Sequence, residues 1–315
     1  MEENKDCDLQ IADKTVKKGL KGYLADFAVG IAIGIAFIIP GFSGGSVAAI
    51  LGVYEKLINA IANIFKEFKK SVITLLPIGL GLIVGALALM FPLGYFLEHF
   101  PLPTVSLFVG LAIGGIPSLS KNVKGKPTAN NVIALSVPLT LALLLSFIPV
   151  GADVNLIGIS FGGYLLLFLV GIIGSCALVV PGISGSMLLL ILGYYNPIVN
   201  LITDHLFRLK DLTECILVLG SCGLGIVAGF FLISVFMKKM LTSYPRGTHF
   251  AIIGFIVGSL PTVYISTMKE AGMISSYLAP ISLPTSVFHY VVCIFLVLAG
   301  VCASFSFSQL FDKNK

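Results

Sequence analysis

Charged residues are scarce in this sequence. Only 11% of its 315 residues are Asp, Glu, Lys or Arg, whereas a soluble domain carries about a quarter. Hydrophobic residues make up 57%, and the mean hydropathy is +1.02. A soluble domain of this composition would have to bury too many apolar faces. Long uncharged runs instead predict membrane-spanning helices, and therefore an all-α polytopic membrane protein.

Several signatures of catalytic and metal sites are missing. The chain has two arginines, Arg208 and Arg246, and no arginine-rich phosphate motif of the kind a lipid phosphatase needs. Its six cysteines show no C-x-x-C spacing, and its four histidines show no helical ligand spacing. We therefore expect no enzyme, no metal and no cofactor. Coupling of the protein's function to H+ or Na+ stays open.

The first 24 residues are polar and lack the short apolar region and cleavage site of a signal peptide. We interpret residues 1–24 as a cytoplasmic tail.

The apolar part of the chain contains two broken segments and six plain runs. The broken segments are residues 25–64 and 157–202, and the plain runs are 72–97, 104–119, 132–149, 212–237, 250–266 and 286–310. A span needs about 20 apolar residues. The run before the first break, Ala25–Ile39, is short for that and carries Asp26. We therefore predict a re-entrant helical hairpin for each broken segment.

The placement of positive charge predicts the topology. With the N-terminus in the cytoplasm, 17 of the 20 Lys and Arg residues fall inside. Only Arg208, Lys210 and Lys269 fall outside. This bias follows the positive-inside rule and places both termini in the cytoplasm of a prokaryote, with the spans in its cytoplasmic membrane.

The two halves of the chain, residues 25–150 and 151–315, resemble each other. "GIAFIIPGFSGGSVAAILGVYEKLI" matches "SCALVVPGISGSMLLLILGYYNPIV" at an offset of 141, and "GLGLIVGALALMF" matches "GLGIVAGFFLISVF" at 144. "LAIGGIPSL" matches "GFIVGSLPTV", also at 144. Each half has one hairpin and three spans, so the second half enters the membrane from the opposite face. This predicts an inverted-topology repeat, which many secondary transporters use.

The breaks themselves read "PGFSGG" and "PGISGS". The first fits G-x-S-x-G, but a hydrolase elbow needs a strand–turn–helix context, so catalysis by Ser43 is disfavoured. A tight break with close packing of small residues explains the pattern without any ligand. The functional alternative is a phosphate or carboxylate held by the first N–H groups of the helix after each break. Its residues are Ser43, Gly44, Gly45, Ser46, Ser184, Gly185 and Ser186.

Other polar residues lie near the breaks. Asp26 and Glu55 are candidates for ion coupling, although we expect both, with Glu98 and His99, at the membrane interface. The second half has Asn196 and Pro197 where the first has Glu55 and Lys56, so the site is asymmetric. Tyr54, Tyr194 and Tyr195 follow the breaks, where an interfacial aromatic belt is the default and headgroup contact the alternative. Arg208 is a candidate for attracting an anionic headgroup, although a solvated loop is the commoner explanation for it.

These motifs resemble the polyprenyl-phosphate translocase family of bacteria and archaea. The resemblance rests on Pro40–Ile58, on Leu178–Tyr195, and on "IGGIPSL" and "VGSLPTVY", and it covers nearly the whole chain. It implies return of undecaprenyl phosphate, the lipid carrier of cell-wall synthesis, across the cytoplasmic membrane. It also implies an acidic residue three positions before the first Pro-Gly, where this chain has Phe37.

We therefore predict a flippase that returns a polyprenyl phosphate from the outer to the inner leaflet. Its expected partners are this lipid and the membrane, and no nucleic acid. A transporter of a small soluble anion shares the same hairpin chemistry and stays open as the alternative. A lipid phosphatase lacks its motif here, and a scaffold has no use for two-sided symmetry.

Overall fold

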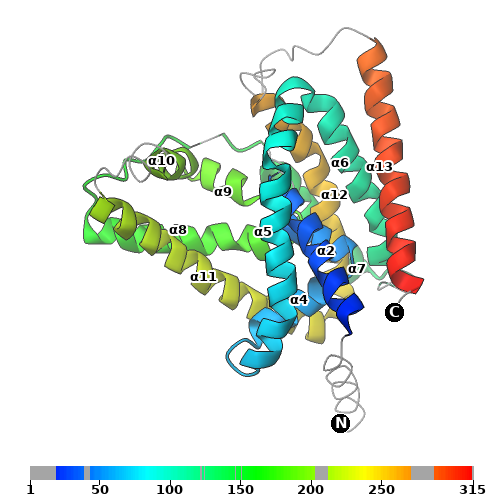
Figure 1. The fold of residues 1–315 in the computed structure, drawn as a ribbon, viewed down its shortest axis with the longest axis horizontal. Coiled ribbons are helices and arrows are strands. Elements are labelled where there is room, and N and C mark those ends of the chain that lie inside the picture. Colours follow the sequence, from blue (N-terminus) through cyan, green and yellow to red (C-terminus); the bar gives the residue numbers. More distant parts are fainter. Residues whose placement is uncertain are drawn as a thin grey trace.

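The computed structural model describes residues 19–38, 43–120, 123, 125–145, 147–149, 151–202, 212–270 and 287–313. These residues form helices and loops, with no strand among them, which confirms the all-α class (Figure 1). Helices α2 (Leu20–Ile38), α3 (Gly44–Ile50), α4 (Tyr54–Ala62), α5 (Phe68–His99), α6 (Pro101–Ser120) and α7 (Ala129–Leu145) form the first half. Helices α8 (Phe161–Val179), α9 (Gly185–Ile191), α10 (Tyr195–Asn200), α11 (Leu212–Ser243), α12 (Pro245–Glu270) and α13 (Val287–Lys313) form the second.

Seven of these helices are long and apolar enough to cross a membrane, and the bent pair α3–α4 would make an eighth. Large apolar side chains also remain exposed on the outer faces of α5, α11 and α13, among them Leu87, Val227 and Ile294. Extended apolar surface of this kind is unfavourable in water and normal against lipid. The chain is therefore a multi-pass membrane protein.

Helix α2 is longer than the apolar run suggested. It begins at Leu20 rather than at Ala25, so Leu20–Phe37 qualifies as a candidate span. Length alone therefore no longer separates a re-entrant arm from a full span. What the structure does place after the first break is a sharp bend, 118° between α3 and α4.

Glycine lets paired helices approach closely, and the pairs recur in both halves. Gly30 and Gly81 lie at the contact of α2 with α5, where a β-carbon on either would overlap the backbone of Ile78 or Phe27. Gly171 and Gly225 do the same at the contact of α8 with α11, against the backbone of Cys222 and Phe168. These residues match at the offsets of 141 and 144 that relate the sequences. Small residues at membrane helix contacts serve this purpose in general.

The remaining long helices pair between the halves. Gly110 of α6 packs on the backbone of Val297 in α13, and Gly254 of α12 packs in the same way on Leu135 in α7. Helix α6 of the first half therefore contacts α13, the last helix of the second half, and α12 of the second half contacts α7, the last helix of the first. Figure 1 shows α6 beside α13, with α8 and α11 extending to the opposite side of the molecule.

The short helices after the two breaks end in the same turn. Gly52 and Gly193 adopt φ of 68° and 76°, in the left-handed region that favours glycine. Backbone bonds from Gly52 N to Ala49 O and from Val53 N to Ala48 O close the first turn. Matching bonds from Gly193 and Tyr194 close the second. This Schellman turn redirects the chain into α4 and α10.

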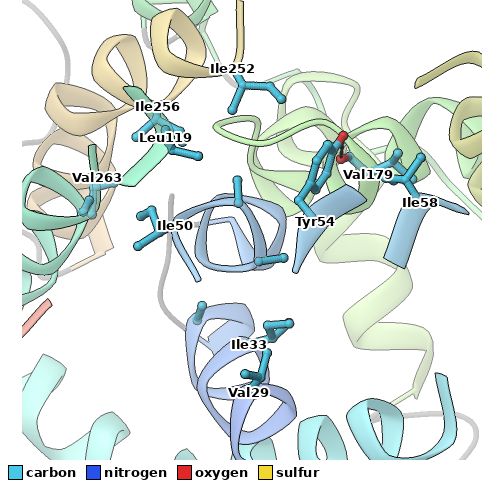
Figure 2. Close-up of a cluster of buried hydrophobic side chains, with 14 of the residues drawn as sticks. Val29, Ile33, Ile50, Tyr54, Ile58, Leu119, Val179, Ile252, Ile256 and Val263 are labelled. Carbon is cyan, nitrogen blue, oxygen red and sulfur yellow. Dashed lines mark hydrogen bonds between the residues drawn. The ribbon is translucent and has the colours of Figure 1, made fainter. Parts of the chain in front are cut away.

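The first hairpin lies in the middle of the main apolar core. Ile33 of α2, Ile50 of α3 and Ile58 of α4 pack with Val179 of α8 and Ile256 of α12 (Figure 2). The end of α8 reaches this core, but most of the buried residues of the second hairpin belong to a separate, smaller cluster that includes Leu167, Tyr194 and Val218. The two hairpins therefore have different surroundings, although their local turns are alike.

Candidate functional site

The two breaks place a serine at the start of each short helix. Ser43 precedes α3 and Ser184 precedes α9, both with extended backbone conformations. The Ser184 hydroxyl accepts a bond from the Met187 amide at 3.4 Å, as an N-cap serine does. The Ser43 hydroxyl instead donates to the carbonyl of Ala177, 3.3 Å away at the end of α8. Equivalent serines therefore have different partners.

The first tip contacts the chain just before the second break. A β-carbon on Gly45 would lie 3.4 Å from the carbonyl oxygen of Val179. The Tyr54 hydroxyl donates to the same oxygen at 2.8 Å, as Figure 2 shows. A β-carbon on Gly185 would lie 3.4 Å from that of Ala177. Residues Ala177–Val179 therefore connect the two sequence-predicted tips.

The two tips differ in burial. Ser43, Gly44, Gly45 and Ser46 are all buried, whereas Ser184 and Gly185 are half-buried. The backbone of Ser186 lies in the first turn of α9, and its side chain is outside the described part of the structure. Pro40–Phe42 of the first break also lie outside the described residues. The first tip is thus closed by the end of α8, and the second is more open.

Asp26 is buried, which corrects the expectation that it lies at the membrane interface. Its carboxylate is 2.5 Å from the ammonium group of Lys56, and their side chains are 8% and 24% exposed. The pair links α2 to α4 within the first hairpin. Because Asp26 is buried, an unpaired charge on its carboxylate would be costly, and the ammonium group of Lys56 offsets that cost.

Glu55 agrees better with the expected interfacial position, since its side chain is 55% exposed. Its carboxylate lies 3.1 Å from Nε2 of His249, and the other ring nitrogen of His249 is 2.7 Å from the Pro245 carbonyl. Both ring nitrogens face acceptors, so this geometry needs a proton on each of them or on Glu55. The contact joins α4 of the first half to α12 of the second.

The three tyrosines that follow the breaks differ in burial. Tyr54 is buried with a satisfied hydroxyl, so the aromatic-belt expectation is wrong for it. Tyr194 is buried too, whereas Tyr195 is exposed. Asn196 donates to Asp153 at 3.2 Å on the exposed side of the second hairpin. Arg208 lies outside the described residues.

Phe37 takes the position where the resemblance implied an acid. Its ring lies against Gly44, where an added β-carbon would overlap it, and 40% of its side chain is exposed. Sequence reasoning missed the partners Lys56, His249 and the carbonyls of Ala177–Val179. The opposite charges of Asp26 and Lys56, both beside apolar runs, were the one available signal for such a pair.

This arrangement defines a class of protein: a multi-pass helical membrane protein with two similar halves and a candidate binding centre where the halves meet. Secondary transporters place their substrates at such a repeat interface. The chain belongs to the VCA0040-like family, described as undecaprenyl phosphate translocase-like, whose model matches residues 33–279.

Two curated relatives carry the name polyprenyl-phosphate transporter. The one from Staphylococcus aureus is 28% identical over 291 residues, which is 91% of this chain and 96% of the relative. The one from Vibrio cholerae is 22% identical over 258 residues, 77% of this chain and 78% of the relative. No solved structure matches the chain significantly.

Proposed function

We propose that this protein returns a polyprenyl monophosphate, such as undecaprenyl phosphate, from the outer to the inner leaflet of the cytoplasmic membrane for cell-envelope glycan synthesis. The family and the names of the two relatives support the lipid substrate. The contact of the first tip with the end of α8 is the observation that carries the site: Ser43 and Gly45 meet Ala177–Val179 immediately before the second break.

The phosphate would be bound by the two tips, through Ser43, Gly44, Gly45, Ser46, Ser184, Gly185 and Ser186. The first amides of a helix have no intrahelical partner, and serine adds a hydroxyl donor. Together these groups would bind an anion without a buried cation. The Ser43 hydroxyl donates to a main-chain carbonyl rather than to a basic side chain, which supports a binding role over a nucleophilic one.

Access would alternate by movement of one half against the other, with the halves in opposite orientations in the membrane. α2 begins and α13 ends on the same side of the molecule in Figure 1, in keeping with the proposed cytoplasmic position of both ends. In the conformation described, Ser43 is bonded to Ala177 and Tyr54 to Val179. Phosphate binding at the first tip would require both bonds to open.

The test is surface labelling of undecaprenyl phosphate in cells with and without the protein. We expect less of the lipid in the outer leaflet when the protein is present. Ser43→Ala and Ser184→Ala should reduce this difference, whereas Ser221→Ala should leave it unchanged. Ser221 is a matched control because it is half-buried on α11, like Ser184 on its own helix, and its hydroxyl donates to Leu217 of the same helix. Equal outer-leaflet levels with and without the protein would refute the proposal.

The same purified protein distinguishes a carrier of small soluble anions. In liposomes, a soluble phosphate or carboxylate that outcompetes the lipid would favour that carrier. Release of inorganic phosphate from the lipid would instead indicate a phosphatase.

A further inference from the structure

A small apolar pocket lies between the two breaks. Its volume is about 250 Å³, and α2, α3, α4, α5, α8 and α11 all contribute to its wall. Phe37 and Leu178 both line it, and each lies three residues before the proline of its own break. The pocket therefore occupies the place where equivalent positions of the two halves come together.

The pocket is continuous with the first tip. Gly44 and Gly45, which belong to the proposed phosphate site, form part of its wall. Tyr54 contributes to the wall while its hydroxyl donates to Val179. Of the described residues that line the pocket, none is charged. A ligand with a phosphate at the tip would thus meet a hydrocarbon surface directly beside its headgroup.

We propose that this pocket binds the isoprene units next to the phosphate of the transported lipid. This inference rests on the proposed function and adds a protein site for the chain to the site for the headgroup. At about 250 Å³ the pocket is smaller than the roughly 300–1,000 Å³ of sites that enclose a whole small-molecule ligand, so it holds only the start of the chain. Phe37 is partly exposed at this wall, which leaves the rest of the chain a way to the bilayer.

Chain selectivity follows from the shape of the pocket. The branched methyl groups of an isoprenoid fill the space between Phe37, Leu178 and Phe230. An unbranched saturated chain leaves part of this space empty and loses the dispersion contacts of its lining. The pocket therefore favours a prenyl phosphate over an alkyl phosphate with the same headgroup.

Gly79 gives a way to fill the pocket without disturbing the fold. It lines the pocket from α5, and a β-carbon added there meets nothing within 4 Å. Gly223 is its equivalent in α11, is also half-buried, and likewise has nothing within 4 Å of an added β-carbon. Gly223 does not line the pocket. Gly79→Leu and Gly223→Leu are therefore matched substitutions, one inside the pocket and one outside it.

The experiment measures binding to the full-length protein in detergent, with farnesyl phosphate, dodecyl phosphate and inorganic phosphate as probes. We expect the unmodified protein to bind farnesyl phosphate more tightly than dodecyl phosphate. Gly79→Leu should bind farnesyl phosphate about tenfold more weakly, the loss that corresponds to about two carbon groups excluded from the pocket. Gly223→Leu should bind as the unmodified protein does. The response to inorganic phosphate should be the same in all three proteins.

The outcomes separate this inference from the proposed function. If Gly79→Leu binds farnesyl phosphate as the unmodified protein does, or if Gly223→Leu weakens binding equally, the inference that the pocket binds isoprene units is refuted. Neither result contradicts the proposed phosphate site. Failure of the unmodified protein to bind undecaprenyl phosphate or farnesyl phosphate overturns the proposed function itself. Thermal unfolding checks that each variant is folded, and Gly79→Ala, which adds less volume, should give a smaller loss in the same direction.

Discussion

Neutralising Asp26 should destabilise the first hairpin by leaving Lys56 without its closest counter-charge. The carboxylate is 2.5 Å from the ammonium group, and only 8% of the Asp26 side chain is exposed. Removing one member of a buried ion pair costs about 3–5 kcal/mol. Since the Lys56 side chain is 24% exposed, we expect Asp26→Asn to cost about 3 kcal/mol, near the lower end of that range.

The reciprocal substitution, Lys56→Met, should lower the free energy of unfolding more than Asp26→Asn does. Lys56→Met leaves the carboxylate of Asp26, the more deeply buried partner, in place. The double substitution Asp26→Asn/Lys56→Met removes both charges and should recover most of the lost stability, because apolar replacement of a buried pair is often neutral or stabilising. A double-mutant cycle should then give a coupling energy of at least about 5 kcal/mol, because the two single losses together exceed about 6 kcal/mol and the double variant keeps little of that loss.

The assay is thermal unfolding of the purified full chain in detergent, followed by lipid transport in liposomes. Glu67 and Lys70 supply the control cycle: they form an ion pair of 3.1 Å at the start of α5, but both side chains are exposed. Removing that pair should change stability by less than about 1 kcal/mol. If Asp26→Asn unfolds at the same temperature as the unmodified protein, the reasoning about burial is refuted.

The same double-mutant cycle distinguishes a structural role of Asp26 from a role in ion coupling. If Asp26 only supports the hairpin, the double variant should transport lipid normally once its stability returns. If Asp26 carries the coupling ion, the double variant should be stable and inactive.

Two further predictions concern the helix pairs and the first tip. Gly81→Ala and Gly225→Ala should each lower the unfolding temperature, because the new β-carbon overlaps backbone in α2 or α8 and overpacking costs about 1–3 kcal/mol. Gly79→Ala and Gly223→Ala, two residues earlier in the same helices, should instead raise it, since Ala is favoured over Gly in a helix by about 1 kcal/mol. Equal unfolding temperatures for Gly81→Ala and Gly79→Ala, or for Gly225→Ala and Gly223→Ala, would contradict the close helix contacts. Tyr54→Phe should cost about 1 kcal/mol by removing the bond to Val179, and Tyr195→Phe should cost less because Tyr195 is exposed. Identical losses from the two tyrosine variants would count against the Tyr54 bond.

The sequence was sufficient for the class of fold. Long apolar runs had to form helices, because a membrane offers no water to satisfy exposed backbone groups. The repeat blocks also contained the glycines of the helix contacts, for Gly81 and Gly225 stand at matching places in "GLGLIVG" and "GLGIVAG". Their role at the α2–α5 and α8–α11 contacts came only from the structure, since a repeat does not say which helices pair.

The sequence could not give the partners of the polar residues. Asp26 and Lys56 are separated by 30 positions, and Tyr54 and Val179 by 125. No local pattern links residues that far apart. The expectation of an interfacial Asp26 came from its position at the start of the apolar run Ala25–Ile39. Because α2 begins five residues earlier, at Leu20, Asp26 lies inside the helix rather than at its first turn.

The halves share a framework, but the polar contacts of the hairpins are not shared. The glycine contacts of α2 with α5 recur in α8 with α11, so both arms are held by the same kind of packing. The Asp26–Lys56 pair has no such counterpart, because Leu167 and Pro197 stand at the equivalent positions. Under the proposed alternating access, these glycine contacts would be the same in both states. They would therefore contribute nothing to the free-energy difference between the states. The energy difference between the states would then reside in a few contacts that the first hairpin makes with the other half: Ser43 with Ala177, Tyr54 with Val179, and Glu55 with His249. Since a ligand shifts such an equilibrium only by its differential affinity, these contacts set how much binding energy the lipid must supply.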